Sequence, residues 1–282
     1  MDTPLNLPPL NTPSLLRRFN LKPRKSLGQN FLVDEVALQK VIKAAEIGKH
    51  DLVLEIGPGL GNLTRYLAIN AKEVIAVELD SNLIPILHEV LDEHENVEII
   101  KADILELELN QVIHQQDYYV IANIPYYITS AIIRQLMEAD NKPKRIVLTI
   151  QQEVARRILA KPGKLSLLAL SVQVFGYPSI AARIPAGAFY PQPKVDSAVI
   201  RVDTYHEPLI PQEQLSTFFI LAKAGFSQKR KTLRNSLSGG LALSKEQCEL
   251  MLQEANIDPQ RRAQTLSLDE WKLLTETYST YD

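Results

Sequence analysis

Four consecutive residues combine the groups needed to hold a flat, amine-bearing molecule. Asn123, Ile124, Pro125 and Tyr126 directly follow the apolar run from Tyr118 to Ala122. The amide offers a hydrogen-bond acceptor, the proline fixes one backbone angle, and the aromatic ring can stack on a base. The segment is therefore a candidate nucleobase site, although the same pattern also occurs as ordinary turn chemistry.

A glycine-rich turn lies earlier in the chain. The segment EIGPGLG at 55–61 places three glycines at alternate positions where an apolar strand gives way to a helix, so the backbone can approach a ligand closely. Glu78 ends the next predicted strand, 21 residues beyond Gly57, where an acid can accept hydrogen bonds from ribose hydroxyls. Asp103 follows the third predicted strand and is placed to accept from the amine of an adenine. Both acids could instead be solvated strand-end carboxylates.

Two classes of nucleotide cofactor fit this turn unequally. The NAD fingerprint requires glycine where this chain has Asn62, and Pro58 is unusual between its first two glycines. The spacing suits S-adenosylmethionine, which has a nucleoside but no pyrophosphate. A nicotinamide-dependent oxidoreductase stays open as an alternative.

Short apolar segments alternate with helix-length segments along the first two thirds of the chain. The predicted strands are 51–56, 74–78, 97–101, 118–122 and 145–150, and the predicted helices between them include 62–69, 82–94 and 130–139. Continuous apolar strands separated by helices predict a parallel sheet covered on both faces, which is an α/β fold. Two further strands, 177–184 and 197–202, leave no room for a helix between them and are expected to add an antiparallel edge. After a linker at 206–211 the pattern is helical, with capping boxes at Ser244 and Ser267.

Composition excludes several classes of protein. The chain has 282 residues, of which 45% are hydrophobic, enough for one large or two modest domains. No segment approaches the roughly 18 apolar residues of a membrane span. The single cysteine, Cys248, excludes an internal disulfide and a cysteine-cluster metal site, and it favours the cytoplasm. The first 21 residues lack a signal-peptide pattern and are expected to form a flexible tail.

Charge is strongly segregated although the net charge is only −2. Between Glu73 and Asp117 there are twelve acids and one base, whereas 154–195 carries six bases and no acid, and 214–245 again carries six bases and no acid. A third basic run spans 17–25. Such segregation indicates a polyanionic partner, although each run taken alone could be a solvated helix face. The candidate RNA-binding residues are Arg156, Arg157, Lys223, Lys229, Arg230, Lys231 and Arg234.

Six motifs together resemble the rRNA adenine dimethyltransferase family, and its small-subunit branch in particular. They are KSLGQNFL at 25–32, EIGPGLG at 55–61, NIPYYI at 123–128, QEVA at 152–155, AFYPQPKVDS at 188–197 and RKTLR at 230–234. The resemblance covers about residues 22–275.

The resemblance implies a fold, a reaction and site residues. It implies a seven-stranded, Rossmann-like S-adenosylmethionine-dependent methyltransferase domain over 22–205 and a small helical RNA-binding domain over 206–282. Such enzymes dimethylate N6 of two adjacent adenines in the 3′-terminal hairpin of 16S rRNA, within a pre-30S particle. The chain is expected to act as a monomer without metal or membrane. By similarity the cofactor residues are Asn30, Leu32, Gly57, Glu78, Asp103 and Asn123.

The residue types in the catalytic segment are consistent with that reaction. The side-chain oxygen of Asn123 and the carbonyl of Ile124 can accept the hydrogens of the target amine, while Tyr126 and Phe189 match the positions that would sandwich the base. Phe189 lies in a proline-rich turn and could instead be a packing residue.

Rival functions stay open. The sister branch methylates a 23S rRNA adenine and shares the NIPY motif, and a non-catalytic assembly or transcription factor could keep the same fold. The segment 161–165 is shorter than the loop usual in the family, which leaves substrate detail unsettled.

Overall fold

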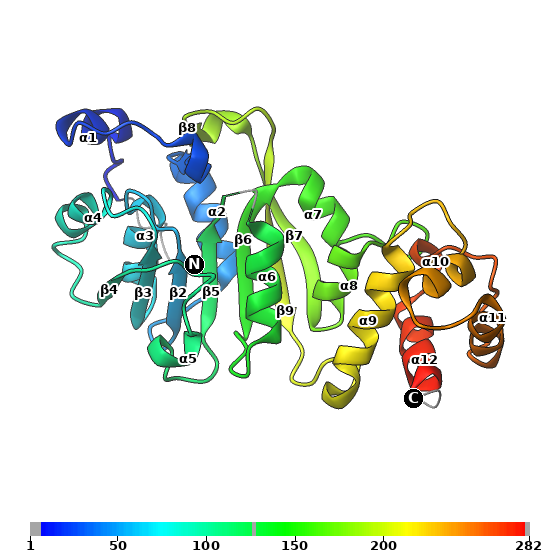
Figure 1. The fold of residues 1–282 in the computed structure, drawn as a ribbon. Helices are drawn as coiled ribbons and strands as arrows, with labels where there is room; N and C mark the ends of the chain where they lie inside the picture. Colours follow the sequence, from blue (N-terminus) through cyan, green and yellow to red (C-terminus); the bar gives the residue numbers. More distant parts are fainter. Residues whose placement is uncertain (1–6, 126–127, 280–282) are drawn as a thin grey trace. The chain divides into compact units, whose positions relative to one another are not determined.

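The computed structural model describes residues 7–125 and 128–279, which fold as two compact units. The first comprises residues 1–155 and 178–204, and the second comprises 156–177 and 205–282 (Figure 1). The sequence placed the boundary at 205/206 alone, whereas 156–177 groups with the C-terminal helices. Among the described residues no helix is both long and apolar enough to cross a membrane.

A seven-stranded sheet forms the centre of the first unit. Its strands, in spatial order, are β4 (Val97–Lys101), β3 (Glu73–Glu78), β2 (Leu52–Ile56), β5 (Tyr119–Asn123), β6 (Arg145–Gln151), β9 (Ser197–Thr204) and β7 (Gly176–Ile184). The strands from β4 to β6 pair in parallel, and β9 pairs antiparallel with β6 from Arg145↔Asp203 to Gln151↔Ser197. The predicted α/β sheet with an antiparallel addition is confirmed, with β9 inserted between β6 and the edge strand β7.

Helices cover both faces of this sheet. Helices α2 (Glu35–Ala45) and α3 (Asn62–Asn70) share one apolar cluster with residues of six strands of the sheet, including Val53, Val74 and Val147. Helix α6 (Thr129–Glu138) lies over the opposite face (Figure 1). Shorter helices are α4 (Ile84–Val90), α5 (Leu109–Val112) and α7 (Gln152–Ile158), of which α7 crosses the boundary between the two units.

The N-terminal segment differs from the prediction. Residues Thr12–Arg18 form helix α1, which begins at Asn11, whose side chain accepts a hydrogen bond from Ser14 N at 3.0 Å. Leu16 of this helix is buried in a cluster with Phe31. The prediction of a flexible tail is therefore wrong for residues 12–18, because a capped turn presents an apolar residue to the first unit.

The second unit is helical, as predicted. Its helices are α8 (Leu167–Gln173), α9 (Leu215–Phe226), α10 (Leu233–Gly240), α11 (Lys245–Glu254) and α12 (Leu268–Tyr278). Trp271 is fully buried, stacked at 5.8 Å between ring centroids on Phe226 and edge-on to Phe218 at 6.4 Å. Both predicted capping boxes are present at the starts of α11 and α12.

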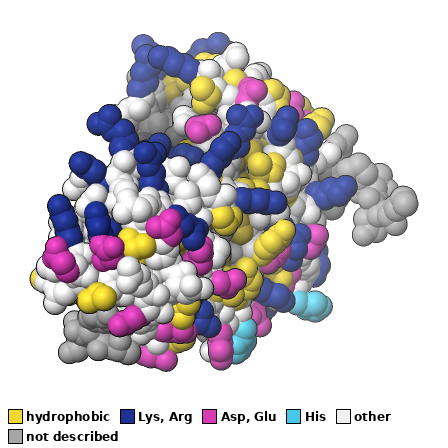
Figure 2. All heavy atoms as spheres, turned by 90° about the vertical axis from the view of Figure 1, so that its right-hand side faces the viewer, with side chains coloured by type: hydrophobic (Ala, Val, Ile, Leu, Met, Phe, Trp, Pro, Cys, Tyr) yellow, Lys and Arg dark blue, Asp and Glu magenta, His cyan; other side chains and the backbone are white. Residues whose placement is uncertain are grey.

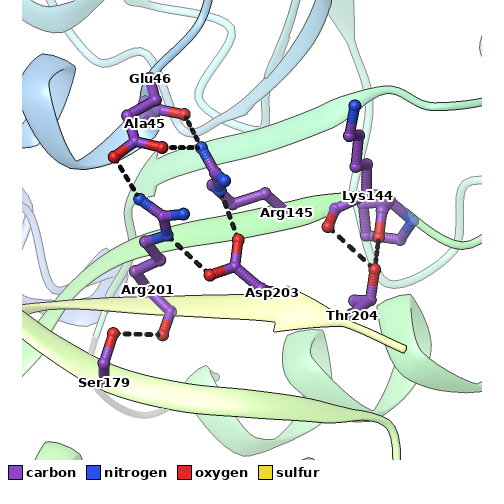
Figure 3. Close-up of polar contacts among 9 residues, drawn as sticks. Ala45, Glu46, Lys144, Arg145, Ser179, Arg201, Asp203 and Thr204 are labelled. Carbon is purple, nitrogen blue, oxygen red and sulfur yellow. Dashed lines mark hydrogen bonds and ion pairs between the residues drawn. The ribbon is translucent and has the colours of Figure 1, made fainter. Parts of the chain in front are cut away.

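Four charged residues form a cluster where the parallel strands begin. Arg145 donates to Asp203 at 2.6 Å and to Glu46 at 3.0 Å, while Arg201 pairs with the same two acids at 2.8 and 2.7 Å (Figure 3). Glu46 follows α2, so this Glu46–Asp203 cluster joins that helix to β6 and β9. The carboxyl ends of the parallel strands lie at the other edge of the sheet.

Candidate active site

A cavity that is partly open to solvent lies at the carboxyl ends of β2, β3, β4 and β5. This is where open α/β sheets bind ligands. Its walls include most of the predicted catalytic and cofactor residues, namely Asn30, Leu32, Gly57, Glu78, Asp103, Asn123, Ile124 and Pro125. Several segments distant in sequence therefore line one cavity, as their motif spacing predicts.

The glycine turn after β2 forms one wall. Gly57 and Gly59 have φ angles of +69° and +64°, a left-handed conformation that side chains rarely adopt. A Cβ on Gly57 would meet nothing within 4 Å, whereas one on Gly59 would lie 2.9 Å from the Phe31 ring. The backbone at Gly57 is thus open to a ligand, and Gly59 is required by the close approach of Phe31.

Glu78 is a buried acceptor rather than a solvated strand-end acid, since its exposed fraction is 6%. Its Oε2 accepts from the Gly59 N–H at 3.0 Å and its Oε1 from the Asp80 N–H at 2.8 Å. Burial raises the pKa of this carboxyl, and the two backbone hydrogen bonds oppose that rise. An ionised carboxylate has about four acceptor positions, so each oxygen can also accept a ligand hydroxyl.

Glu55 is buried still more deeply on the same wall, with 1% exposed. Burial raises its pKa to about 8, the neighbouring Thr64 hydroxyl lowers it, and the charge of Glu78 raises it. Among the described residues the Oε2 of Glu55 and the Oδ1 of Asn62 have no hydrogen-bond partner. Buried polar atoms without a partner, next to an open glycine turn, suit a polar ligand, because such groups are costly to leave unpaired.

The ends of β4 and β5 supply two more polar groups. Asp103 Oδ1 accepts from Leu105 N at 2.9 Å, and Asp103 lines the cavity. Asn123 Nδ2 donates to the backbone oxygen of Asn30 at 3.0 Å. Because this hydrogen bond uses the amide nitrogen of Asn123, its Oδ1 is the atom that can accept from a ligand amine in the cavity.

The two predicted stacking residues are placed differently. Tyr126 lies outside the described residues. Phe189, in strand β8 (Phe189–Tyr190), pairs with Leu32 of β1 (Phe31–Leu32) and is only 4% exposed within the apolar cluster of α2 and α3. The described cavity walls do not include Phe189.

The predicted RNA-binding residues lie in the second unit. Six are exposed: Arg156, Arg157, Lys223, Lys229, Arg230 and Lys231. Arg234 differs, because it is half-buried and pairs with Glu249 of α11 at 2.6 Å. Figure 2 shows many Lys and Arg side chains gathered over the upper part of one face, with acidic side chains mostly over the lower part.

No group of three or more His, Cys, Asp or Glu within the described part of the chain is arranged to hold a metal ion. The polar groups of the cavity are instead hydrogen-bond acceptors, suited to an organic ligand.

Comparison with known proteins decides the family. The sequence model described as ribosomal RNA adenine dimethylase matches residues 20–279. The chain belongs to the ribosomal RNA adenine dimethylase family. The relationship inferred from the six motifs is thereby confirmed, and a nicotinamide oxidoreductase is excluded.

Individual relatives of this dimethylase agree in sequence and in fold. The chain is 42% identical to ribosomal RNA small subunit methyltransferase A of Dehalococcoides mccartyi strain 195, over 99% of both chains. It is 42% identical to the protein of the same name from Alkaliphilus metalliredigens, over 95% and 96% of the two chains.

Two solved structures are also similar. A dimethyladenosine transferase from Plasmodium falciparum has a TM-score of 0.76 and 27% identity, over 89% of this chain and 98% of that one. The 23S rRNA methyltransferase ErmE has a TM-score of 0.69 and 28% identity, over 89% and 100%.

Two residues that line the cavity, Glu55 and Gln29, received no role from the sequence, and neither did Asp80, whose backbone N–H donates to Glu78. Glu55 and Gln29 lie inside recognised motifs, and Asp80 follows Glu78 by two positions. A buried position at the end of an apolar strand was a signal for Glu55. Gln29 Nε2 donates to Asp80 Oδ2 at 2.9 Å. Neither residue carries a local sequence signal, because this contact joins residues 51 positions apart.

Proposed function

We propose that this dimethylase uses S-adenosylmethionine to dimethylate N6 of two adjacent adenines in the 3′-terminal hairpin of 16S rRNA, within a pre-30S particle. The observation that carries the proposal is the single cavity that brings Gly57, Glu78, Asp103 and Asn123 together on the ends of four neighbouring strands. The 42% identity over nearly full length to a small-subunit methyltransferase favours this substrate over large-subunit RNA.

The cavity residues fit each part of the donor. Glu78 would accept the ribose hydroxyls, Asp103 would accept from the adenine amine, and the open backbone at Gly57 would adjoin the methionine part. Asn30 and Leu32 would line the cavity next to the cofactor, on either side of Phe31, which lies against the glycine turn. S-adenosylmethionine supplies a methyl group activated by its sulfonium charge.

The chain's own residues then position the acceptor. The N6 lone pair of adenine is delocalised into the ring, so the amine is a poor nucleophile until its hydrogens are held out of the ring plane. The Oδ1 of Asn123 and the carbonyl of Ile124 would accept those hydrogens, and Pro125 would fix the turn that presents them. Positioning and preorganised acceptors, rather than a strong base, would supply most of the rate.

Stacking would hold the base. Tyr126 is assigned to one face of the adenine, at about 1–3 kcal/mol for a stacked base. Phe189 in its buried position supports Leu32 and the cavity wall, and stacking by this ring requires it to leave that packing when the substrate enters. The target adenine must also be unpaired or flipped to reach the cavity.

The exposed bases of the second unit would bind the RNA backbone. Reversal of Lys229, Arg230 and Lys231 to Glu should weaken RNA binding and make its salt dependence shallower, because each lost phosphate contact removes about 0.7–0.9 from the slope of log K against log salt. The matched control is reversal of Lys40, Lys43 and Lys49, which are exposed in the first unit. Equal salt slopes for the two triple variants would refute this assignment.

We expect the enzyme to act as a monomer in the cytoplasm.

Methyl transfer from labelled S-adenosylmethionine tests the substrate assignment. Small-subunit particles lacking adenine dimethylation and large-subunit RNA are offered in parallel. Label recovered as dimethyladenosine from small-subunit RNA is the expected result. Label on large-subunit RNA would make the protein a sister-branch enzyme, and label on neither would favour a non-catalytic factor.

A further inference from the structure

Residues 24–32, here called the 24–32 strip, run along one wall of the cavity and contain little regular structure. They include a three-residue turn at Lys25–Leu27 and the two-residue strand β1. Leu27 to Leu32 line the cavity. Apart from the pairing of β1 with β8, the backbone hydrogen bonds of the strip lie within its own turn. Side-chain contacts therefore hold this turn against the rest of the first unit.

Asp80 supplies the anchor at one end of the strip. Its side chain is 3% exposed. The Oδ2 accepts from Gln29 Nε2 at 2.9 Å, and the Oδ1 accepts from Arg24 Nη1 at 3.1 Å. Gln29 also accepts from the Arg24 N–H through its Oε1 at 2.7 Å, which closes the turn onto itself.

Asp80 is itself held in place by its neighbours. Asn82 donates to Asp80 Oδ1 from its backbone nitrogen at 3.1 Å and from its side chain at 2.8 Å. The Asp80 backbone N–H donates to Glu78. Burial opposes ionisation, but the hydrogen bonds from Asn82 and Gln29 and the charge of Arg24 outweigh it and lower the pKa of Asp80. Asp80 is therefore an ionised anchor at neutral pH.

The other end of the strip reaches the groups assigned to the acceptor. The carbonyl of Asn30 accepts from Asn123 Nδ2 at 3.0 Å, and Leu32 pairs with Phe189 across β1 and β8. The strip thus connects the Glu78 side of the cavity to the amide that faces the target amine.

We propose that Asp80 is a positioning residue that anchors the 24–32 strip through Gln29 and thereby fixes both the cofactor wall and the orientation of Asn123. This proposal rests on the proposed function. If the strip shifts, Asn123 loses the acceptor that holds its nitrogen. The amide can then rotate and present a donor instead of an acceptor to the amine. Loss of the anchor should therefore slow methyl transfer even when the cofactor is saturating.

Donor and acceptor can be exchanged across this contact. Asp80→Asn removes the acceptor for Gln29, and Gln29→Glu removes the donor and places two carboxylates together. In the double variant the amide introduced at position 80 can donate to the carboxylate introduced at position 29, whose other oxygen still accepts from Arg24 N. The amide at position 80 would keep its Oδ1 for Asn82, so the double variant restores the geometry with reversed polarity. A cycle of this kind isolates the pairwise interaction.

The test measures S-adenosylhomocysteine binding by calorimetry, single-turnover methyl transfer at saturating cofactor, and hydrogen exchange of the strip without cofactor. Each single variant should weaken binding at least fivefold, slow transfer at least tenfold and speed exchange over residues 24–32. The double variant should return to within threefold of the wild type in binding and transfer. Asp203→Asn, a partnered acid in the Glu46–Asp203 cluster, is the control and should match the wild type in all three.

Two results would overturn the anchor role. One is a transfer rate at saturating cofactor that the single variants leave unchanged, which would make the contact merely structural. The other is a double variant as impaired as the worse single one. If Asp80→Asn does not fold, Gln29→Glu and Gln29→Ala decide the same question, with Gln29→Ala expected to slow transfer at least fivefold. A wild type that neither binds cofactor nor transfers methyl would refute the proposed function, whereas hydrogen exchange would still decide the anchor.

Discussion

Acidic residues at the two opposite ends of the sheet's strands have different electrostatic surroundings. In the Glu46–Asp203 cluster each acid pairs with two arginines, and hydrogen bonds from Arg201 and Arg145 hold the pKa of Glu46 below its ordinary value. At the cavity, Glu55 and Glu78 are more deeply buried, and neither forms an ion pair with any described residue. Burial raises the pKa of both.

Under the proposed function, this difference separates the acids that stabilise the fold from those that would bind the cofactor. A buried acid without a cation costs stability whether it stays ionised or takes up a proton, and hydrogen bonds from a bound ligand can offset that cost. The arginine-paired acids satisfy their own charge and need no ligand. On this proposal, buried acids without a cationic partner, rather than a large number of acids, distinguish the candidate active site.

The largest expected effect concerns the pH dependence of stability through Glu55. Its pKa is raised to about 8 in the folded protein, so the folded state binds more protons than the unfolded state between the two pKa values. The free energy of unfolding should fall as pH rises from about 5 to about 8, with a slope of up to about 1.4 kcal/mol per pH unit. Glu55→Gln should flatten that slope, as measured by urea unfolding across this range. Identical slopes for wild type and variant would mean that Glu55 is ionised when folded.

A second prediction compares two glycines. Gly59→Ala should cost about 1–3 kcal/mol of stability, because alanine would adopt a left-handed backbone and its Cβ would approach Phe31 within 2.9 Å. Gly48, close in sequence to Glu46, is the control, since its added Cβ would make an ordinary contact 3.7 Å from Asp51. Gly48→Ala should change stability by less than about 1 kcal/mol. Denaturant unfolding measures both, and equal losses would show that the turn is not specially constrained.

The smallest expected effect is at the arginine-paired edge. Burial opposes the shift at Asp203, but hydrogen bonds from Arg201 and Arg145 lower its pKa when folded. Its contribution is therefore present above its unfolded pKa and is lost as pH falls through the folded value. Asp203→Asn should cost about 1 kcal/mol near neutral pH, since the side chain is 41% exposed. The difference from wild type should therefore shrink as pH falls below the unfolded pKa of about 4. A difference that grows on acidification would contradict the sign.

Sequence reasoning succeeded where the signal is local. The strands of the sheet lie within about two residues of their predicted bounds. The five parallel strands were predictable because each is a short, mainly apolar run separated from the next by a helical segment. Gly57, Glu78, Asp103 and Asn123 could be assigned to one edge because parallel strands end there together.

Sequence reasoning failed where the signal is long-range or weak. The anchor between Gln29 and Asp80 and the contact of Arg145 with Glu46 join residues 51 and 99 positions apart, so no periodicity reveals them. Strands β1 and β8 have two residues each, which is too short for a pattern. Helix α1 did carry a signal, since Asn11 and Pro13 are typical of a helix start, but the proline-rich context favoured a tail.

Titration of S-adenosylmethionine into the wild type and two variants tests most directly whether the cavity that contains Glu78 is the cofactor site. Calorimetry would compare the wild type with Glu78→Ala, at the cavity, and Asp203→Ala, at the paired cluster. We predict that Glu78→Ala weakens binding by about 10- to 100-fold, as expected for roughly 1.5–3 kcal/mol of lost hydrogen bonds to a charged acceptor. Asp203→Ala should bind as the wild type does. An unchanged dissociation constant for Glu78→Ala, or an equal loss in both variants, would contradict the assignment of the cavity.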